Sequence, residues 1–219
     1  MSLGQKIIDF IEKRRQEKLF KIVGPLGDFY RAGGNELLSD IPVESTDIVL
    51  DIGAYKGEWT STIFIRYGCH CHLYEPVKSF YDICFQKFKV NPFIKVFNAA
   101  IGNSMRQGVF HLSDNGTSEF IKEKQEKVIA PVIDIKSVLD DLSDSKIGCL
   151  KINIEGGEYE LMERLNEVNY TSKIKCFLIQ FHQQPSDYLK RYENIVRDLS
   201  KTHSRVWSYD MVWEKWIIK

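Results

Sequence analysis

The stretch DIVLDIGAYKGE at residues 47–58 decides the fold of this chain. Its first part, residues 47–53, is a short apolar run of the kind that forms a fully buried strand. Gly53 permits a tight turn with close backbone approach, and Gly57 opens the helix that we expect over residues 58–67. A buried strand that passes through a glycine turn into a helix is the first unit of an α/β sheet.

The same alternation of strands and helices continues along the chain. Further strands are expected at residues 69–74, 94–100, 128–135, 147–154 and 175–181. Further helices are expected at residues 77–89, 136–142, 157–168 and 187–201. Strands that alternate with helices predict a parallel sheet that is covered on both faces. A polar segment at 102–127 predicts an inserted β-hairpin, and residues 205–218 predict a terminal antiparallel pair.

These elements predict an α/β fold with a doubly wound, mostly parallel sheet and an antiparallel C-terminal strand. Ahead of the sheet, residues 1–46 are expected to form a helical extension over 3–22 and an irregular cover segment after it. Residues 47–219 are expected to be the domain that carries the chemistry. A chain of 219 residues is long enough for one such domain.

The charge balance argues against nucleic acid as a partner, because 30 Lys and Arg residues face 30 Asp and Glu residues. No run approaches the roughly 18 apolar residues that span a membrane, and the N-terminus lacks the apolar core of a secretory signal. The five cysteines include no CxxC pair, and most lie in apolar segments, which is typical of core thiols. We therefore expect a cytoplasmic protein without a nucleic-acid or membrane partner.

A Cys-His-Cys-His run at residues 69–72 suggests a metal site at first sight. In an extended strand, however, the two cysteines face one side and the two histidines the other, so the four side chains cannot converge on one ion. No metal site is expected there.

The glycine turn lies where open α/β sheets bind their ligands, at the carboxyl end of the first strand. Its D-x-G-x-x-x-G spacing differs from the G-x-G-x-x-G of dinucleotide sites, since Tyr55 occupies the place of the glycine that makes room for a pyrophosphate. Glu75 ends the next strand, where a carboxylate can accept bonds from both hydroxyls of a ribose. The pattern predicts a nucleoside-type cofactor and disfavours an NAD-dependent oxidoreductase.

Four segments of the chain resemble the FkbM family of S-adenosylmethionine-dependent methyltransferases, which has the class I, Rossmann-like methyltransferase fold. They are DIGAYKGEWT, YEPVKSFYDICFQKF, NAAIGN and LKINIEGGEYELMERL, and they follow in that order. The resemblance implies S-adenosylmethionine as the cofactor. The residues that it implies for cofactor binding are Asp51, Gly53, Ala54, Tyr55, Gly57, Glu75, Pro76, Asn98 and Ala99.

Within that set, the resemblance implies that the turn at 51–57 cradles the methionine part of the cofactor and that Glu75 holds the ribose. Asn98 and Ala99 would border the adenine. It also places the DNGTSEF segment at 114–120 near the active site, with Asn115 and Ser118 as candidates.

One departure from the family pattern concerns Asn153, where the family usually has Asp. An amide keeps its hydrogen-bonding capacity but cannot carry charge or act as a base. Glu155 follows the fourth core strand and His182 ends the fifth, so both are candidates for the base that a methyl transfer needs. Glu155, His182 and Asn153 are therefore the expected catalytic residues.

Purely structural roles also remain open for Glu155 and His182. His182 could be bonded to a backbone carbonyl, and Glu155 could cap the helix that follows it. Glu158 and Glu160 are expected to be surface or capping groups. Glu155 and His182 alone are too few ligands to predict a divalent metal.

The expected function is O-methylation of a small hydroxylated molecule, such as a sugar or a secondary metabolite, and the resemblance carries that substrate class. The alternative is a degenerate domain that binds cofactor or a partner without turnover, because Asn153 departs from the family pattern. A lid, a homodimer contact and a plain cover all remain open for residues 1–46. The C-terminal aromatic residues are expected to pack in the core or at the sheet edge rather than to bind substrate; they are Trp207, Tyr209, Trp213 and Trp216.

Overall fold

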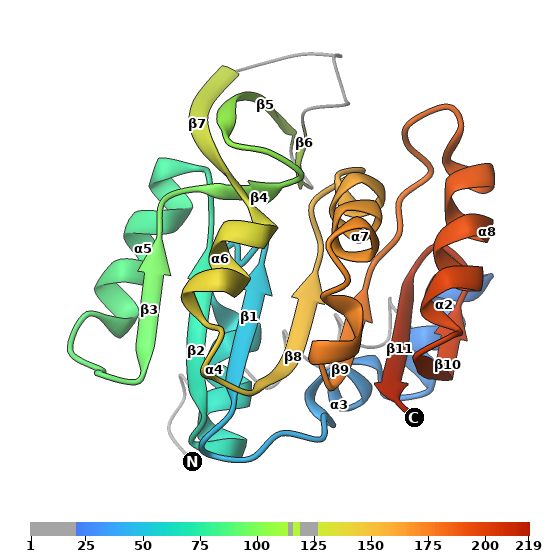
Figure 1. Ribbon diagram of the computed structural model, residues 1–219, viewed down its shortest axis with the longest axis horizontal. Helices are drawn as coiled ribbons and strands as arrows, with labels where there is room; N and C mark the ends of the chain where they lie inside the picture. Colours follow the sequence, from blue (N-terminus) through green and yellow to red (C-terminus); the bar gives the residue numbers. More distant parts are fainter. Residues whose placement is uncertain (1–20, 114–115, 119–126) are drawn as a thin grey trace.

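The computed structural model describes residues 21–113, 116–118 and 127–219, and it is organised around a seven-stranded sheet (Figure 1). The order of the strands is β10-β11-β9-β8-β1-β2-β3. Their bounds are β1 Ile48–Ile52, β2 His70–Tyr74, β3 Ile94–Phe97, β8 Ile147–Ile152, β9 Cys176–Ile179, β10 His203–Tyr209 and β11 Trp213–Ile218. Neighbours from β3 to β9 are parallel, whereas β11 runs antiparallel to both β9 and β10. The doubly wound sheet with an antiparallel C-terminal strand is thus confirmed.

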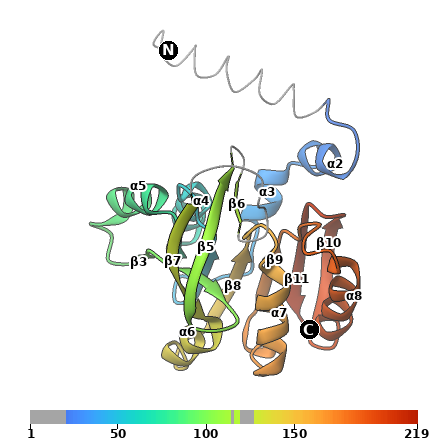
Figure 2. The ribbon, with the colours of Figure 1, turned by 90° about the horizontal axis from the view of Figure 1, so that it is seen from above.

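Helices cover both faces of this sheet, as Figure 2 shows from above. The helices α2 Pro25–Arg31, α3 Gly34–Ser39, α4 Glu58–Tyr67 and α5 Lys78–Phe88 lie on one face. The opposite face carries α6 Ile135–Asp141, α7 Glu158–Glu167 and α8 Tyr188–Leu199. Strand β1 is apolar except for Asp51, because hydrophobic clusters lie on both of its faces. Ile48 and Leu50 belong to the hydrophobic cluster on the α7 face, and Val49 between them belongs to the cluster on the α4 face.

A second sheet of four strands, in the order β4-β7-β5-β6, lies above the carboxyl end of β1 in Figure 1. It contains β4 Ala100–Gly102, β5 Arg106–Ser113, β6 Gly116–Ser118 and β7 Lys127–Asp134. The expected hairpin is present as β5 and β6, which pair antiparallel, and β7 pairs antiparallel with β5.

The third strand differs from the expectation of one strand over residues 94–100. Strand β3 ends at Phe97, and Ala100 begins β4, which pairs in parallel with β7 in the second sheet. The Asn98 side chain donates hydrogen bonds to the carbonyls of Glu75 and Pro76, at 2.9 and 3.0 Å. These bonds fix the turn at which the chain leaves the main sheet.

The segment at 23–46 is also more regular than its Gly and Pro content predicts. Pro25 stands in the first turn of α2, where its missing N–H costs nothing, and Phe29 of that helix is buried against Trp207 and Tyr209. Most of the helix expected over residues 3–22, and Asn115, lie outside the described residues. No helix within those residues is long and apolar enough to cross a bilayer.

Candidate functional site

The candidate site lies where the carboxyl ends of β1, β2, β8 and β9 meet, below the second sheet in Figure 1. These four strands are parallel neighbours, so the loops that follow them emerge at one edge. The loops after β1, β2, β8 and β9 carry most of the residues that the sequence analysis selected as candidates.

The turn after β1 presses against the loop after β8. Gly53 has a φ of +81°, and a Cβ at this position would lie 2.0 Å from the carbonyl oxygen of Asn153. The amides of Gly53 and Ala54 both donate to the carbonyl of Tyr74, at 3.1 and 3.2 Å. Only glycine at position 53 allows the turn to touch both neighbouring strands in this way.

A buried ion pair holds the same turn from below. The Asp51 carboxylate accepts a bond from Thr60 Oγ1 at 2.7 Å and another from Lys151 Nζ at 2.9 Å. Lys151 also donates to the Gly53 carbonyl at 2.8 Å. Both carboxylate oxygens of Asp51 therefore accept hydrogen bonds from protein groups, and the side chain stabilises the turn rather than facing solvent.

Sequence reasoning missed Lys151 and Thr60 in this role. The signal for Lys151 was its place in the otherwise apolar strand IGCLKI, because a lysine buried in a central strand needs a partner for its charge. The partner, Asp51, is 100 positions away in the sequence, and only the fold brings the two together.

Glu75 is buried at the end of β2, and only 4% of its surface is exposed. Its carboxylate accepts a bond from the Tyr55 amide at 2.8 Å and one from the Val77 amide at 2.9 Å. Burial raises the pKa of Glu75 to about 7, although these two amides favour the ionised form. Asn98 holds the backbone of Glu75 and Pro76, so the structure brings together Tyr55, Glu75, Pro76 and Asn98.

Glu155 and His182 meet at the ends of β8 and β9. His182 Nε2 lies 3.5 Å from a carboxylate oxygen of Glu155, and His182 Nδ1 lies 2.9 Å from a carboxylate oxygen of Glu158. Burial of the imidazole opposes its charge, but its bonds with the two carboxylates prevail and raise the pKa of His182 to about 10.

Glu158 corrects one expectation, because it is not a surface group. Its residue is fully buried in the first turn of α7. Nor does its carboxylate cap α7, because it accepts bonds from the amides of Ile154 and Gly156, at 2.9 and 2.8 Å, which belong to the loop before the helix. Its contact with His182 is what the sequence analysis missed.

Asn153 begins the loop after β8 with an unsatisfied acceptor. Within the part of the chain that the structure describes, its side-chain oxygen is buried and has no hydrogen-bond partner. Gln184, in the loop after β9, has a second such oxygen. A buried acceptor without a partner is costly, so each oxygen is available to a donor on a ligand.

The residues at this edge fit S-adenosylmethionine, the cofactor that the sequence resemblance implies. Glu75 presents a desolvated carboxylate at the strand end where ribose hydroxyls bind, and within the described residues each of its oxygens accepts one amide bond, which leaves a second lone pair for a hydroxyl. The backbone carbonyl of Asn153 lies against the glycine turn, and the side-chain oxygen of the same residue is a buried acceptor that the ammonium group of the methionine part would satisfy.

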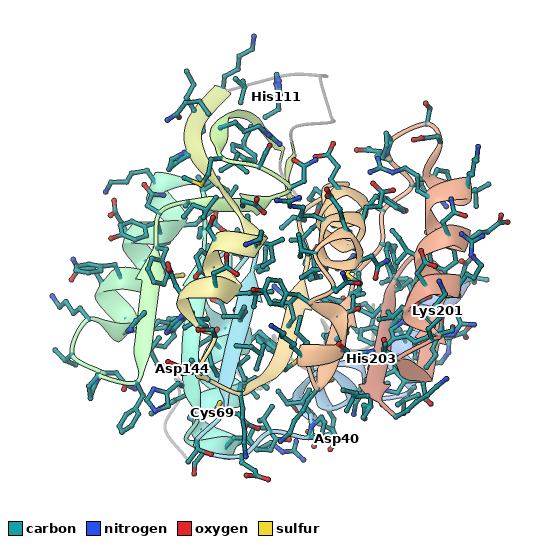
Figure 3. The ribbon with its side chains drawn as sticks, in the orientation of Figure 1. Asp40, Cys69, His111, Asp144, Lys201 and His203 are labelled. Atoms are coloured by element: carbon teal, nitrogen blue, oxygen red, sulfur yellow. The ribbon has the colours of Figure 1, made fainter. Side chains whose placement is uncertain are left out.

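All five cysteines are free and buried. Cys84 packs under the glycine turn, where its thiol donates to the Tyr55 carbonyl at 3.2 Å. Cys69 instead lies at the opposite end of the molecule from His111 of the second sheet (Figure 3). Trp213 and Trp216 are 7% and 2% exposed, so they pack in the core as expected. No group of three or more His, Cys, Asp or Glu side chains in the described ranges is placed to hold a metal ion.

Comparisons with known proteins give the following matches. The family model of the methyltransferase FkbM domain matches residues 51–209, whereas no curated protein sequence matches the chain. Among solved structures, Sp1610 of Streptococcus pneumoniae in complex with S-adenosyl-L-methionine is similar at 11% identity and a TM-score of 0.47, over 85% of this chain and 71% of that chain. Precorrin-6y C5,15-methyltransferase of Geobacter metallireducens has 11% identity and a TM-score of 0.46, over 84% and 87%. An rRNA methylase of Streptococcus thermophilus has 8% identity and a TM-score of 0.48, over 85% and 93%.

Proposed function

Since this chain belongs to the FkbM family of S-adenosylmethionine-dependent methyltransferases, we propose that it methylates a hydroxyl oxygen of a small molecule, such as a sugar or a secondary metabolite. The observation that supports this proposal most is the pairing of Glu155 with His182 at the carboxyl ends of β8 and β9. A carboxylate at the reaction edge, held there by a neighbouring imidazole, supplies the proton-removing group that O-methylation needs.

The cofactor would be held by residues of three strand ends. Glu75 would accept the ribose hydroxyls, and the backbone of Gly53, Ala54 and Tyr55 would lie against the methionine part. The adenine would lie near Pro76, Asn98 and Ala99. When bound, the cofactor supplies the methyl group, whose new bond to the acceptor oxygen replaces its bond to sulfur while the old electron pair stays on sulfur.

Glu155 is the group that receives the hydroxyl proton in this proposal. His182 lies between two carboxylates, which favour its charged form, and an imidazolium has no lone pair for a proton. The Glu155 side chain is 24% exposed, so an acceptor can reach it, whereas the Glu158 side chain is fully buried. A base must lie within about 2.6–3.2 Å of the oxygen that it deprotonates.

The polar groups at this edge favour a hydroxylated substrate over a nucleic acid. Glu155, whose side chain is 24% exposed, accepts hydrogen bonds, which matches the donors of a polyol. A phosphate backbone offers only acceptors and negative charge there, and the chain has no net positive charge to attract it. The buried, free cysteines support a reducing compartment and thus the cytoplasmic location that we propose.

Thermal unfolding tests the cofactor part of the proposal. S-adenosylhomocysteine at 100 times its dissociation constant should stabilise the protein by about 2.7 kcal/mol, which raises the unfolding midpoint by several degrees. NAD and ATP at equal concentrations serve as controls. A shift with NAD instead of S-adenosylhomocysteine would contradict our reading of the turn around Tyr55.

A substitution of Glu155 tests the chemistry. Glu155→Gln should lower the rate of methyl transfer to a hydroxylated acceptor by about 10²–10⁴-fold, because the amide cannot take the proton. Its shift of the unfolding midpoint with S-adenosylhomocysteine should equal that of the wild type. A variant that retains full transfer would show that Glu155 is not the base.

Asn153 favours one second candidate, a domain that binds the cofactor without turnover. An amide at this position cannot carry charge, unlike the Asp that the family usually has. Stabilisation by S-adenosylhomocysteine, with no transfer to any sugar or polyol in a broad panel, would favour that candidate. Transfer that Glu155→Gln abolishes would exclude it.

A further inference from the structure

Glu158 is a fully buried carboxylate at the centre of the candidate site, and neither the family match nor the sequence pattern assigns it a catalytic part. A carboxylate that is removed from water must be paired and hydrogen-bonded to remain charged. Glu158 has three such partners: the amides of Ile154 and Gly156 and the ring of His182. Each of these contacts acts on one of the two residues that the proposed reaction uses.

The two amide contacts act on Glu155. Ile154 and Gly156 flank Glu155 in the chain, and Glu158 binds both amides, at 2.9 and 2.8 Å. Between them, Glu155 has a φ of +54°, in the left-handed region that long side chains rarely adopt. Glu158 therefore clamps the backbone on both sides of a strained residue and fixes the direction in which Glu155 leaves the loop.

The third contact acts on His182. A carboxylate only accepts hydrogen bonds, so His182 Nδ1 must donate its proton to Glu158 across 2.9 Å. The other ring nitrogen then faces the Glu155 carboxylate at 3.5 Å, where a second N–H is favoured. With a proton on each nitrogen, the ring is an imidazolium between two carboxylates, and the pKa of His182 near 10 agrees with this geometry.

The other contacts near His182 in the described part of the chain involve its backbone and neighbouring residues rather than its ring nitrogens. The Tyr159 hydroxyl, from α7, donates to the His182 carbonyl at 2.6 Å and fixes its backbone. On α8, the guanidinium of Arg191 lies over the Tyr159 ring, 5.5 Å from its centroid, and forms an ion pair with Glu163. From the loop after β8 and from α7, the charged groups that face the ring are Glu155 and Glu158.

We infer that Glu158 is a positioning residue, which sets the backbone of Glu155 and holds His182 against it as an imidazolium, so that Glu155 alone receives the substrate proton. The statement about the proton rests on the proposed function. The charge state of His182 does not, because it can be measured on the protein without an acceptor.

An NMR titration of the histidine rings tests the inference directly. His182→Gln identifies the His182 signal in the wild-type spectrum. The wild-type ring should remain charged at pH 8, and Glu158→Gln should lower its titration midpoint by at least about one pH unit. Glu160→Gln is the matched control, because it removes a carboxylate from the same turn of α7 and should leave the midpoint unchanged.

Two results would overturn the inference: a wild-type His182 that is neutral at pH 8, or an equal midpoint in Glu158→Gln. If Glu158→Gln fails to fold, the ¹⁵N spectrum of the wild type still decides, since the inference requires a proton on both ring nitrogens at pH 8. One protonated nitrogen would overturn it.

The rate of methyl transfer supplies a second readout that a purely structural role would not move. Glu158→Gln should lower kcat by about tenfold or more, with the KM for S-adenosylmethionine unchanged within about threefold. Because loss of the His182 proton removes the charge that holds Glu155, activity should fall as the pH rises through the His182 midpoint, and in Glu158→Gln this fall should occur at lower pH. A kcat loss with an unmoved pH profile would overturn the positioning role.

Failure of the proposed function would look different. In that case Glu158→Gln would still lower the His182 midpoint, but the protein would methylate no hydroxylated acceptor. That result would overturn the proposed function and support the role of Glu158.

Discussion

At the scale of single residues, burial decides what the acidic groups of the site can do. Glu75 and Glu158 are both removed from water, but they differ in their partners. Glu158 contacts the ring of His182, whose charged form has the opposite sign to a carboxylate, whereas the partners of Glu75 are two neutral backbone amides. Burial therefore leaves the pKa of Glu75 raised to about 7, in a range where a ligand can change its protonation state.

Cofactor affinity should depend on pH through Glu75. Ribose hydroxyls that donate to the carboxylate favour its ionised form, so binding should lower the pKa of Glu75 below its value of about 7 in the free protein. Affinity for S-adenosylhomocysteine is then full above pH 7 and falls as the pH drops, by up to about tenfold per pH unit. Calorimetric titrations between pH 5.5 and 8 measure this slope.

Glu75→Gln is the control for that titration, because an amide binds more weakly but does not titrate. The variant should show a lower affinity that is constant over the same pH range. A pH-independent affinity in the wild type would mean that Glu75 does not contact the ribose.

At the scale of elements, the close approach of the turn after β1 to the loop after β8 depends on Gly53, which has no side chain. Gly53→Ala would place a methyl group 2.0 Å from the Asn153 carbonyl, which is backbone and cannot rotate away. The turn must then move off β8, and we expect binding of S-adenosylhomocysteine to be lost and the protein to be destabilised by more than about 2 kcal/mol.

Gly68→Ala is the matched control for this substitution. Gly68 also has a positive φ, +62°, but its added Cβ would meet nothing within 4 Å. It should cost only the left-handed backbone penalty of about 1–2 kcal/mol and leave cofactor binding intact. Equal effects of the two variants on binding would show that the close approach at Gly53 has no role in the site. Urea unfolding and the thermal shift with S-adenosylhomocysteine compare them.

The order of the elements was predictable from sequence because strands buried on both faces have continuous apolar runs, as IVLDI in β1 shows. The candidate site was predictable to the same extent, since strand ends in a parallel sheet share one edge. The split between β3 and β4 was not, because it depends on the bonds of Asn98 to the end of β2. Glu158 was missed for a related reason: a glutamate in the first turn of a helix is typical of a solvated cap, and its partner His182 comes from the loop after β9.

At the scale of the whole molecule, the segment before the sheet and the end of the chain share one core. Phe29 of α2, Ile41 and Val43 belong to the same hydrophobic cluster as Val49 of β1 and Trp213 of β11. We propose that the boundary expected at residue 46 divides the chain by function only: the candidate site lies after it, but the residues on both sides fold as one unit. Residues 23–46 would then unfold together with the sheet.

Phe29 tests that proposal, because it is 2% exposed and its ring centroid lies 5.3 Å from that of Tyr209. Phe29→Ala should lower the free energy of unfolding by about 3–5 kcal/mol, since it leaves a cavity between α2 and β10. Phe85→Ala, at a site that is 42% exposed on α5, should cost less than about 1 kcal/mol. Urea unfolding followed by circular dichroism and by tryptophan fluorescence should give coincident transitions, because Trp207 and Trp213 lie in the shared core. If α2 instead unfolds as a separate unit, fluorescence will change before circular dichroism, and Phe29→Ala will move only the earlier transition.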